Sequence, residues 1–387
     1  MSHATAARTF ASLASLLCIF LISAQSPAFS NRVAKTLSPT GSMHYPRASH
    51  SASLLPDGTV LIAGGFAGSG SESRPYVSTE LFDPASGEFH GGPDMTVPRS
   101  GHAAVTLNDN RILLVGGWSA ASGVTNSAEV YDPATHRFSS VGSMAVARGE
   151  CTATLLEDGR VLITGGVDHN ERALSSAEVF DPRSNSFSSA GSMLVPRSQH
   201  TATLLQHGAV LITGGGSCDC PSKTVYRDAE LFEPSVGKFV SVGSLSAARY
   251  KHIAVLLGDG RVLVAGGSDA RDWRGLLSSA ELYDPSSRSF QSLPAMNASR
   301  FKFPQAAVRL QSGDVFIAGG AQFPELFRPR ERTFVTVPGG FEAARYFASA
   351  TLLNDGGVLV VGGYSEGKGG LPATSRAWLY QQIKSIN

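Results

Sequence analysis

Charge and cysteine are both scarce in this chain. Only 16% of its 387 residues are charged, 32 basic residues balance 31 acidic ones to a formal net charge of +1, and no run of Lys or Arg occurs. Nucleic-acid binding needs concentrated positive charge, so we expect no nucleic-acid partner. Only four cysteines occur, and the three that follow the N-terminal apolar stretch, Cys151, Cys218 and Cys220, are odd in number and irregularly spaced. They do not make a disulfide framework, so stability must come from a hydrophobic core.

Glycine and proline are plentiful instead, at 42 and 20 residues. Apolar residues are dispersed and do not gather into stretches with a helical period. Together these features favour many short strands joined by tight turns. We therefore expect an all-β protein.

The N-terminus differs from the rest of the chain. One charged residue, Arg8, precedes an apolar stretch from Phe10 to Ala24, after which the chain turns polar. This pattern is typical of a secretory signal peptide, which we assign to residues 1–25. An uncleaved anchor is the alternative, although a bilayer span needs about 20 apolar residues. We expect a secreted or periplasmic monomer without a stable membrane span after cleavage, with residues 30–387 forming one domain.

The mature chain repeats one unit seven times. A hydrophobic segment ends in paired glycines beginning at Gly64, Gly116, Gly165, Gly214, Gly266, Gly319 and Gly362. A period near 50 residues is typical of a propeller blade.

Residues 144–187 contain the whole unit. CTATLL and RVLITGG predict two strands, and Asp158-Gly159 between them predicts a two-residue type I′ hairpin turn. AEVF predicts a third strand that ends at Asp181-Pro182, because proline offers no ladder donor. A fourth strand follows around Phe187.

These residues resemble the kelch family, whose blades carry a double glycine after the second strand and a small-Glu-apolar-aromatic-Asp-Pro third strand. The resemblance covers nearly all of the chain after residue 25 and implies a seven-bladed β-propeller of four-stranded antiparallel blades. It says little about function, because kelch propellers serve as binding platforms, scaffolds and occasionally enzymes.

Closure of the ring requires a fourth strand for the last blade, which would otherwise leave a sheet edge unpaired. NRVAKTLSPTGSMHYPR near the N-terminus aligns with NSFSSAGSMLVPR at 185–197, so we expect Arg32 to Leu37 to supply that strand. The alternative is QQIKS at 381–385.

The loops after the paired glycines are long and all different, except for AQFP in the sixth blade. Alternate connections of a meander emerge on opposite faces, so these loops share a face with the links between blades. Variable loops on a rigid scaffold are where recognition concentrates. We expect function on this face.

Each link carries an arginine, and the third residue after it is usually histidine: His50, His102, His200 and His252, with Cys151, Phe303 and Ala348 in the remaining blades. We expect the arginines to pair with third-strand glutamates such as Glu129, Glu178 and Glu230. The histidines are expected to form hydrogen bonds in the core or between blades and not to bind a metal, because facing sheets lie about 10 Å apart.

Two positions in each link vary, and their large residues gather in blades five to seven. Aromatic rings beside Lys and Arg suit a glycan or an acidic peptide, whereas packing that plugs the channel is the alternative. The candidate ligand-binding residues are Glu150, Gln199, Tyr250, Lys251, Arg271, Trp273, Arg274, Phe301, Lys302, Tyr346 and Phe347.

Cys218-Asp219-Cys220 is a second local feature, which predicts a loop disulfide or free thiols, or alternatively a soft-metal site. Elsewhere no cofactor motif, metal cluster or nucleophile–base constellation stands out.

We therefore favour a non-catalytic propeller that binds an extracytoplasmic protein or a glycan. The alternative is a sugar-active kelch enzyme, either galactose oxidase-like, for which no copper motif is found, or sialic acid mutarotase-like. The latter would use Glu150 with basic partners Lys251, Lys302 and Arg274.

Overall fold

The computed structural model describes residues 35–68, 74–119, 123–219, 222–365 and 372–382. The predicted signal peptide and Cys220 lie outside these ranges, as does Arg32, and the side chain of Cys218 is not described. The propeller belongs to one compact unit, Ala34–Asn387. No helix among the described residues is long and apolar enough to cross a membrane.

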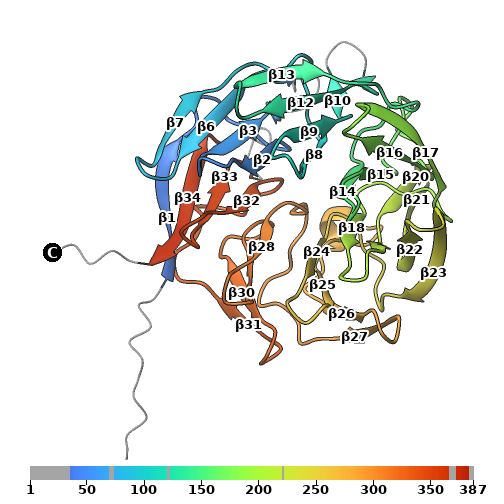
Figure 1. Ribbon diagram of the computed structural model, residues 1–387. Coiled ribbons are helices and arrows are strands. Elements are labelled where there is room, and N and C mark those ends of the chain that lie inside the picture. The colour runs from blue at the N-terminus through green and yellow to red at the C-terminus, as the bar shows by residue number, and fades with distance from the viewer. Residues whose placement is uncertain (1–34, 69–73, 120–122, 220–221, 366–371, 383–387) are drawn as a thin grey trace, which may run out of the picture. The chain divides into compact units, whose positions relative to one another are not determined.

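Seven four-stranded antiparallel sheets form a β-propeller, as the repeats predicted, and follow one another around the ring in chain order (Figure 1). Blades one to three consist of β2 (Ser51–Leu54), β3 (Val60–Ala63), β6 (Thr79–Asp83) and β7 (Glu88–Gly91); β8 (Ala103–Thr106), β9 (Ile112–Val115), β12 (Ala128–Asp132) and β13 (Arg137–Ser140); and β14 (Thr152–Leu155), β15 (Val161–Thr164), β16 (Ser176–Asp181) and β17 (Ser186–Ser192).

Blades four to six have the same strand order. They consist of β18 (Thr201–Leu204), β19 (Val210–Thr213), β22 (Asp228–Glu233) and β23 (Lys238–Ser244); β24 (Ile253–Leu256), β25 (Val262–Ala265), β26 (Ala280–Asp284) and β27 (Ser289–Ser292); and β28 (Ala307–Arg309), β29 (Val315–Ile317), β30 (Glu325–Arg328) and β31 (Thr333–Thr336).

The seventh blade closes the ring with both ends of the described chain. Its strands are β32 (Ser349–Leu352), β33 (Val358–Val361), β34 (Arg376–Gln382) and β1 (Lys35–Ser42), with Leu37 opposite Tyr380. Blue β1 lies beside red β34 in Figure 1. Closure by an N-terminal strand is confirmed. The alternative is wrong, because Gln381 already belongs to β34, the strand that β1 pairs with.

The core lies within and between the sheets. Every residue of the second strands is buried, as in β15 and β19, because these strands have a neighbouring strand on both edges and a neighbouring blade on each face. Outer strands such as β13 are mostly exposed. This is the alternation of burial that a propeller of packed sheets requires.

The turn between the first two strands differs from the prediction. Gly159 has φ +85°, but Asp158 is not in the left-handed region that a type I′ turn needs at both central residues. Leu156 instead accepts a bond from Gly159 N–H and donates one to the Arg160 carbonyl, which makes a three-residue loop. The Asp158 carboxylate accepts Arg160 N–H at 3.0 Å and so stabilises the loop without positive φ.

Among the described residues, three short two-stranded ribbons and one turn of 3-10 helix follow the paired glycines. They are β4 (Phe66–Ala67) with β5 (Arg74–Pro75), β10 (Trp118–Ser119) with β11 (Gly123–Val124), β20 (Gly216–Asp219) with β21 (Ser222–Val225), and η2 (Asp272–Arg274). In every blade except the sixth, the residue after the glycine pair forms a β-bridge with the link of its own blade, as Trp118 does with Ser100. Loops and links therefore share one face, as predicted.

Candidate functional site: the mouth of the central channel

The link arginines hold this face in place from beneath. In blades one to six each arginine is buried and pairs with the third-strand glutamate at 2.6 to 3.1 Å. Arg99, for example, also donates to the carbonyl of Gly116, the first residue of the glycine pair. Burial lowers the pKa of Arg99, and the nearby Glu129 carboxylate partly offsets that effect. The prediction of structural Arg–Glu pairs is confirmed.

The paired glycines make this arrangement possible. A Cβ on Gly116 would lie 2.3 Å from the carbonyl oxygen of Arg148 in the next blade's link, and its φ is +64°. Only glycine allows the link to approach the second strand so closely. The glycine pair therefore fixes each link against the neighbouring blade.

Blade seven departs from this pattern. Trp378 occupies the glutamate position, and Arg345 lies over its ring, 5.3 Å from the centroid. The guanidinium also pairs with Glu342 at 3.0 Å, a side chain that is 48% exposed. A cation–π contact and a partly solvated ion pair replace the buried pair of the other blades.

The four link histidines form hydrogen bonds between blades, as predicted. His102 Nε2 lies 2.9 Å from the Ser51 hydroxyl, and His200 Nε2 lies 2.8 Å from Thr164. Burial, with a smaller effect of the adjacent arginine, lowers the pKa of His102 and of His200 to about 3. They stay neutral near neutral pH and act as structural links.

In blades three and six, which lack the link histidine, the residue that would form its hydrogen bond is replaced as well. Cys151 replaces the histidine in blade three and packs with Ala103, where a hydroxyl would otherwise stand. Phe303 replaces it in blade six and lies in one cluster with Ile253. Burial raises the pKa of Cys151 to about 11, so its thiol is protonated at neutral pH. Polar pairs are thus exchanged for apolar pairs.

The second residue after each link arginine lines the mouth of the channel, and we call these seven the rim residues: Ser49, Gly101, Glu150, Gln199, Lys251, Lys302 and Phe347. All seven have φ between +52° and +58°. In six of them the backbone N–H donates to the carbonyl of the rim residue in the preceding blade, at 2.6 to 3.4 Å. The backbone forms a ring of amide hydrogen bonds, and only the side chains differ.

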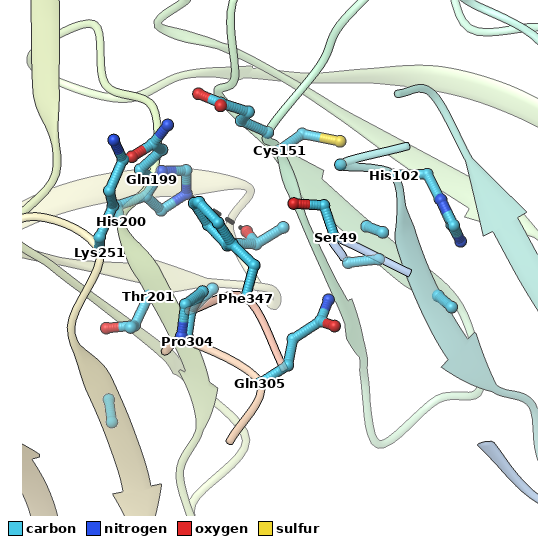
Figure 2. Close-up of a pocket in the computed structure, with 18 of the residues that line it drawn as sticks. Ser49, His102, Cys151, Gln199, His200, Thr201, Lys251, Pro304, Gln305 and Phe347 are labelled. Atoms are coloured by element: carbon cyan, nitrogen blue, oxygen red, sulfur yellow. Dashed lines mark hydrogen bonds between the residues drawn. The ribbon is translucent and has the colours of Figure 1, made fainter. Parts of the chain in front are cut away.

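A cavity of about 260 Å³ lies within this ring. The rim side chains of Ser49, Glu150, Gln199, Lys251 and Phe347 line it, and Figure 2 shows several of them around one common space. Pro304 and Gln305 also line it, from a turn that precedes the shortened first strand of blade six. Below the rim the wall is made largely of alanines from the first strands.

The aromatic candidates come together, but they are mostly buried. Tyr250 is 3% exposed and Phe301 is 0% exposed, and their rings make an edge contact at 5.5 Å. Trp273 makes edge contacts with Phe301 at 5.3 Å and with Tyr346 at 4.9 Å. Such rings have little free face for stacking on a ligand, which favours the alternative in which they plug this side of the channel.

The basic candidates of this side contact the same rings. Lys302 is buried, donates to the Tyr364 hydroxyl at 2.7 Å and lies 4.1 Å from the Trp273 ring centroid. Lys251 lies 4.8 Å from the Tyr250 centroid. Arg271 is exposed and pairs with Asp269 at 2.5 Å, and Arg274 is exposed at the end of η2. Neither arginine lines the cavity.

We call Ser49, Gly101, Glu150 and Gln199 the early half of the mouth, and Lys251, Lys302 and Phe347 with the rings behind them the late half. Sequence reasoning favoured the late half as the place for a ligand, although its candidates also included Glu150 and Gln199 of the early half. It missed Trp118, a half-buried side chain that stands over the early half. A Cβ on Gly149 would lie 3.0 Å from its Nε1. The glycines at 101 and 149 were the available signal, because they leave room for a large neighbour.

Two sequence models match the chain. The KLHDC2/KLHL20/DRC7 Kelch-repeats domain matches residues 27–216, and the Kelch motif matches residues 249–297. An F-box/kelch-repeat protein of Arabidopsis thaliana is 31% identical over 154 residues, which is 36% of this chain and 39% of that protein. The chain therefore aligns with well under two thirds of that relative's length.

Among solved structures, a fungal alcohol oxidase of the AA5 family in complex with copper superposes with a TM-score of 0.72 and 17% identity. The match covers 90% of this chain and 76% of the oxidase, and at this identity it shows the fold alone. Within the described ranges no three His, Cys, Asp or Glu side chains are grouped so that they could hold a metal ion. These residues do not fit a metal centre.

Proposed function

We propose that this chain, whose repeats are kelch repeats, is a binding module that recognises a segment of a partner protein at the channel mouth. The observation that carries the proposal is the rim. Seven equivalent positions share one backbone conformation and one hydrogen-bond ring, while their side chains range from glycine to lysine and phenylalanine around an open cavity. Different side chains on a constant backbone are typical of recognition surfaces.

Two further points favour binding over catalysis by the thiol and imidazole groups that line the cavity. Cys151 lines the cavity, but its pKa of about 11 leaves almost no thiolate at neutral pH. His102 and His200 also line it, yet each is engaged between blades with a pKa of about 3, far from the working range of a general base.

The location outside the cytoplasm belongs to the proposal. It is supported by the charged, apolar and polar order of residues 1–26, which is that of a secretory signal. A partner would then be an extracytoplasmic protein, with a glycan as the second ligand class.

A selection of displayed random peptides against the purified protein tests the binding site. We expect binding of the selected peptides to be lost in Gln199→Ala and kept in Gln206→Ala. Both residues belong to blade four, but Gln206 is exposed in the turn at the opposite end of β18. Binding that survives Gln199→Ala and fails in Gln206→Ala would place the site on the opposite face.

A sugar-active enzyme remains the second candidate, because Glu150 and Lys251 line the same cavity. A glycan array combined with an anomerisation assay separates the two classes. Turnover that disappears in Glu150→Gln would support the enzyme, whereas binding without turnover supports the module.

A further inference from the structure

The two halves of the mouth differ in how far their polar groups are already engaged. In the late half, aromatic rings have cations of this chain against them. Lys302 lies near Trp273 and Tyr364, while Lys223 lies 3.6 Å from the Tyr250 centroid. The protein itself supplies the positive charge that these rings attract.

In the early half, two acceptors have no donor among the described residues. The Glu150 carboxylate is half-buried, and no described Lys, Arg or His nitrogen lies within 4.0 Å of it; nor does any described group donate a hydrogen bond to it. Gln199 Oε1, in the next blade, is buried and has no hydrogen-bond partner among the described residues. Both side chains line the cavity. A buried acceptor without a donor is unfavourable, as is, to a smaller extent, a half-buried one, so this half of the mouth is suited to a ligand that donates hydrogen bonds.

An aromatic ring stands beside one of these acceptors, Glu150. The Cβ position of Gly101 is 3.4 Å from Trp118 Cδ1 and 3.8 Å from Glu150 Cγ, so both side chains border the same point on the rim. Trp118 makes no ring contact and no cation–π contact with the described residues, unlike Trp273 in the late half. Gly101 has no side chain there, which leaves the space between them open.

We propose that the early half binds the ammonium or guanidinium group of a partner's Lys or Arg side chain. The cation donates to Glu150 and Gln199 and lies beside the indole of Trp118, and the small residues Ser49 and Gly101 let its aliphatic stem enter. Carboxylate, amide oxygen and indole are the groups that recognise such cations. This inference rests on the proposed function and names the ligand chemistry of the same site.

Fluorescence polarisation with short labelled peptides tests the proposal. The peptides share a neutral Gly/Ser sequence and differ at one central residue, which is Lys, Arg, norleucine or Glu. We expect the Lys and Arg peptides to bind at least about tenfold more tightly than the norleucine peptide, which is the effect of one charge-assisted hydrogen bond. Equal binding of the norleucine peptide, or no detectable binding of either cationic peptide at millimolar concentration, would overturn the proposal.

Matched variants locate the cation. Glu150→Gln should weaken the Lys peptide by about tenfold or more, because the amide keeps the size of the side chain but loses its charge. Glu157→Gln, in the exposed turn at the opposite end of the same blade, makes the same charge change and should have no effect. Unchanged binding in Glu150→Gln, in a variant that melts like the parent protein, contradicts the assignment.

Two further comparisons complete the test. Trp118→Ala should weaken the Lys peptide, and Trp118→Phe should restore part of the affinity because an aromatic face remains. Butylammonium is the free-cation probe: displacement of the Lys peptide at equal molar concentration would show a site for small amines instead of a protein segment. Displayed peptides that need Gln199 but contain no basic residue would refute the cation and leave the proposed function standing.

Discussion

The early and late halves of the mouth share one backbone and differ in what their side chains do. All seven rim residues have the same left-handed conformation, yet Lys302 is packed among rings, while Glu150 faces the cavity and has no partner within the part of the chain that the structure describes. The difference shows that the propeller keeps the link geometry constant through its buried interactions. The rim side chains are then free either to stabilise the fold or to meet a ligand.

The largest expected effect comes from a comparison of the ion pairs that hold the links of the two halves. Glu129→Gln removes the partner of Arg99, whose side chain is fully buried, and should lower the free energy of unfolding by about 3–5 kcal/mol. Glu342→Gln in blade seven should lower it by less than about 1 kcal/mol, because that carboxylate is half exposed. Urea denaturation measures both. Equal losses would mean that blade seven depends on its ion pair and not on Trp378.

A matched pair of tryptophan substitutions compares the halves directly. Trp273→Ala should lower the free energy of unfolding by about 2–4 kcal/mol, because its ring joins Phe301, Tyr346 and Lys302. Trp118→Ala should lower it by less than about 1 kcal/mol, since its ring has no aromatic neighbour among the described residues. Thermal and urea unfolding provide the measurements. The reverse order would assign the structural role to the early half.

The pH dependence of stability should follow the link histidines, which occur in blades one, two, four and five. His102 has a pKa of about 3 when folded and an ordinary value near 6.5 when unfolded, so the unfolded state binds the extra proton as pH falls. Stability is therefore full above pH 6.5 and decreases toward pH 3. Below about pH 6, each such histidine contributes a slope of roughly 1.4 kcal/mol per pH unit.

A double variant tests that slope. His102→Cys with Ser51→Ala copies the apolar pair that Cys151 of blade three forms with Ala103 of blade two. We expect the urea midpoint to fall less steeply between pH 6 and pH 4.5 than in the parent protein. An unchanged slope would show that His102 is not a source of the acid sensitivity.

The smallest effect concerns the strain of the rim. Glu150 has φ +56°, which glycine adopts freely, so Glu150→Gly should raise the free energy of unfolding by about 0.5–1 kcal/mol while it removes the proposed cation site. Glu157→Gly, at a residue without positive φ, should lower it by a similar amount. Lys302→Gly should also lower it, because its ring contacts are lost. A destabilised Glu150→Gly variant would show that this side chain supports the fold.

The propeller fold could be predicted from the sequence because the residues that it requires recur from blade to blade. A glycine where a Cβ would meet a carbonyl, and an arginine with a glutamate about 30 residues later, return in nearly every blade. The alignment of the N-terminal GSM segment with blade three predicted a closing strand at Arg32 to Leu37, and β1 is found a little later in the chain, at Lys35–Ser42. Because the same residues recur in nearly every blade, each structural requirement is observed several times, which makes the prediction of the fold secure.

The site was harder to predict because its residues do not repeat. Nothing in Glu150, Lys251 or Phe347 as residue types indicates a left-handed backbone, which the inter-blade hydrogen bonds impose. Tyr250 and Phe301 were identified as large and aromatic, but their burial depends on the loops of neighbouring blades. The type I′ turn predicted from Asp158-Gly159 was wrong, because the hydrogen bond from Arg160 N–H to the Asp158 carboxylate stabilises a three-residue loop instead.

The pairing of β1 with β34 has a consequence for the order of folding. Lys35 lies opposite Gln382, so the first strand of the described ring pairs with its last, and the two are far apart in sequence. Six blades can assemble while the chain is being made, but the seventh must wait for residues at the far end. Until then one sheet edge stays open, and such edges can pair with other chains. Pairing of β1 with β34 therefore covers the sheet edge that would otherwise stay open in blade seven.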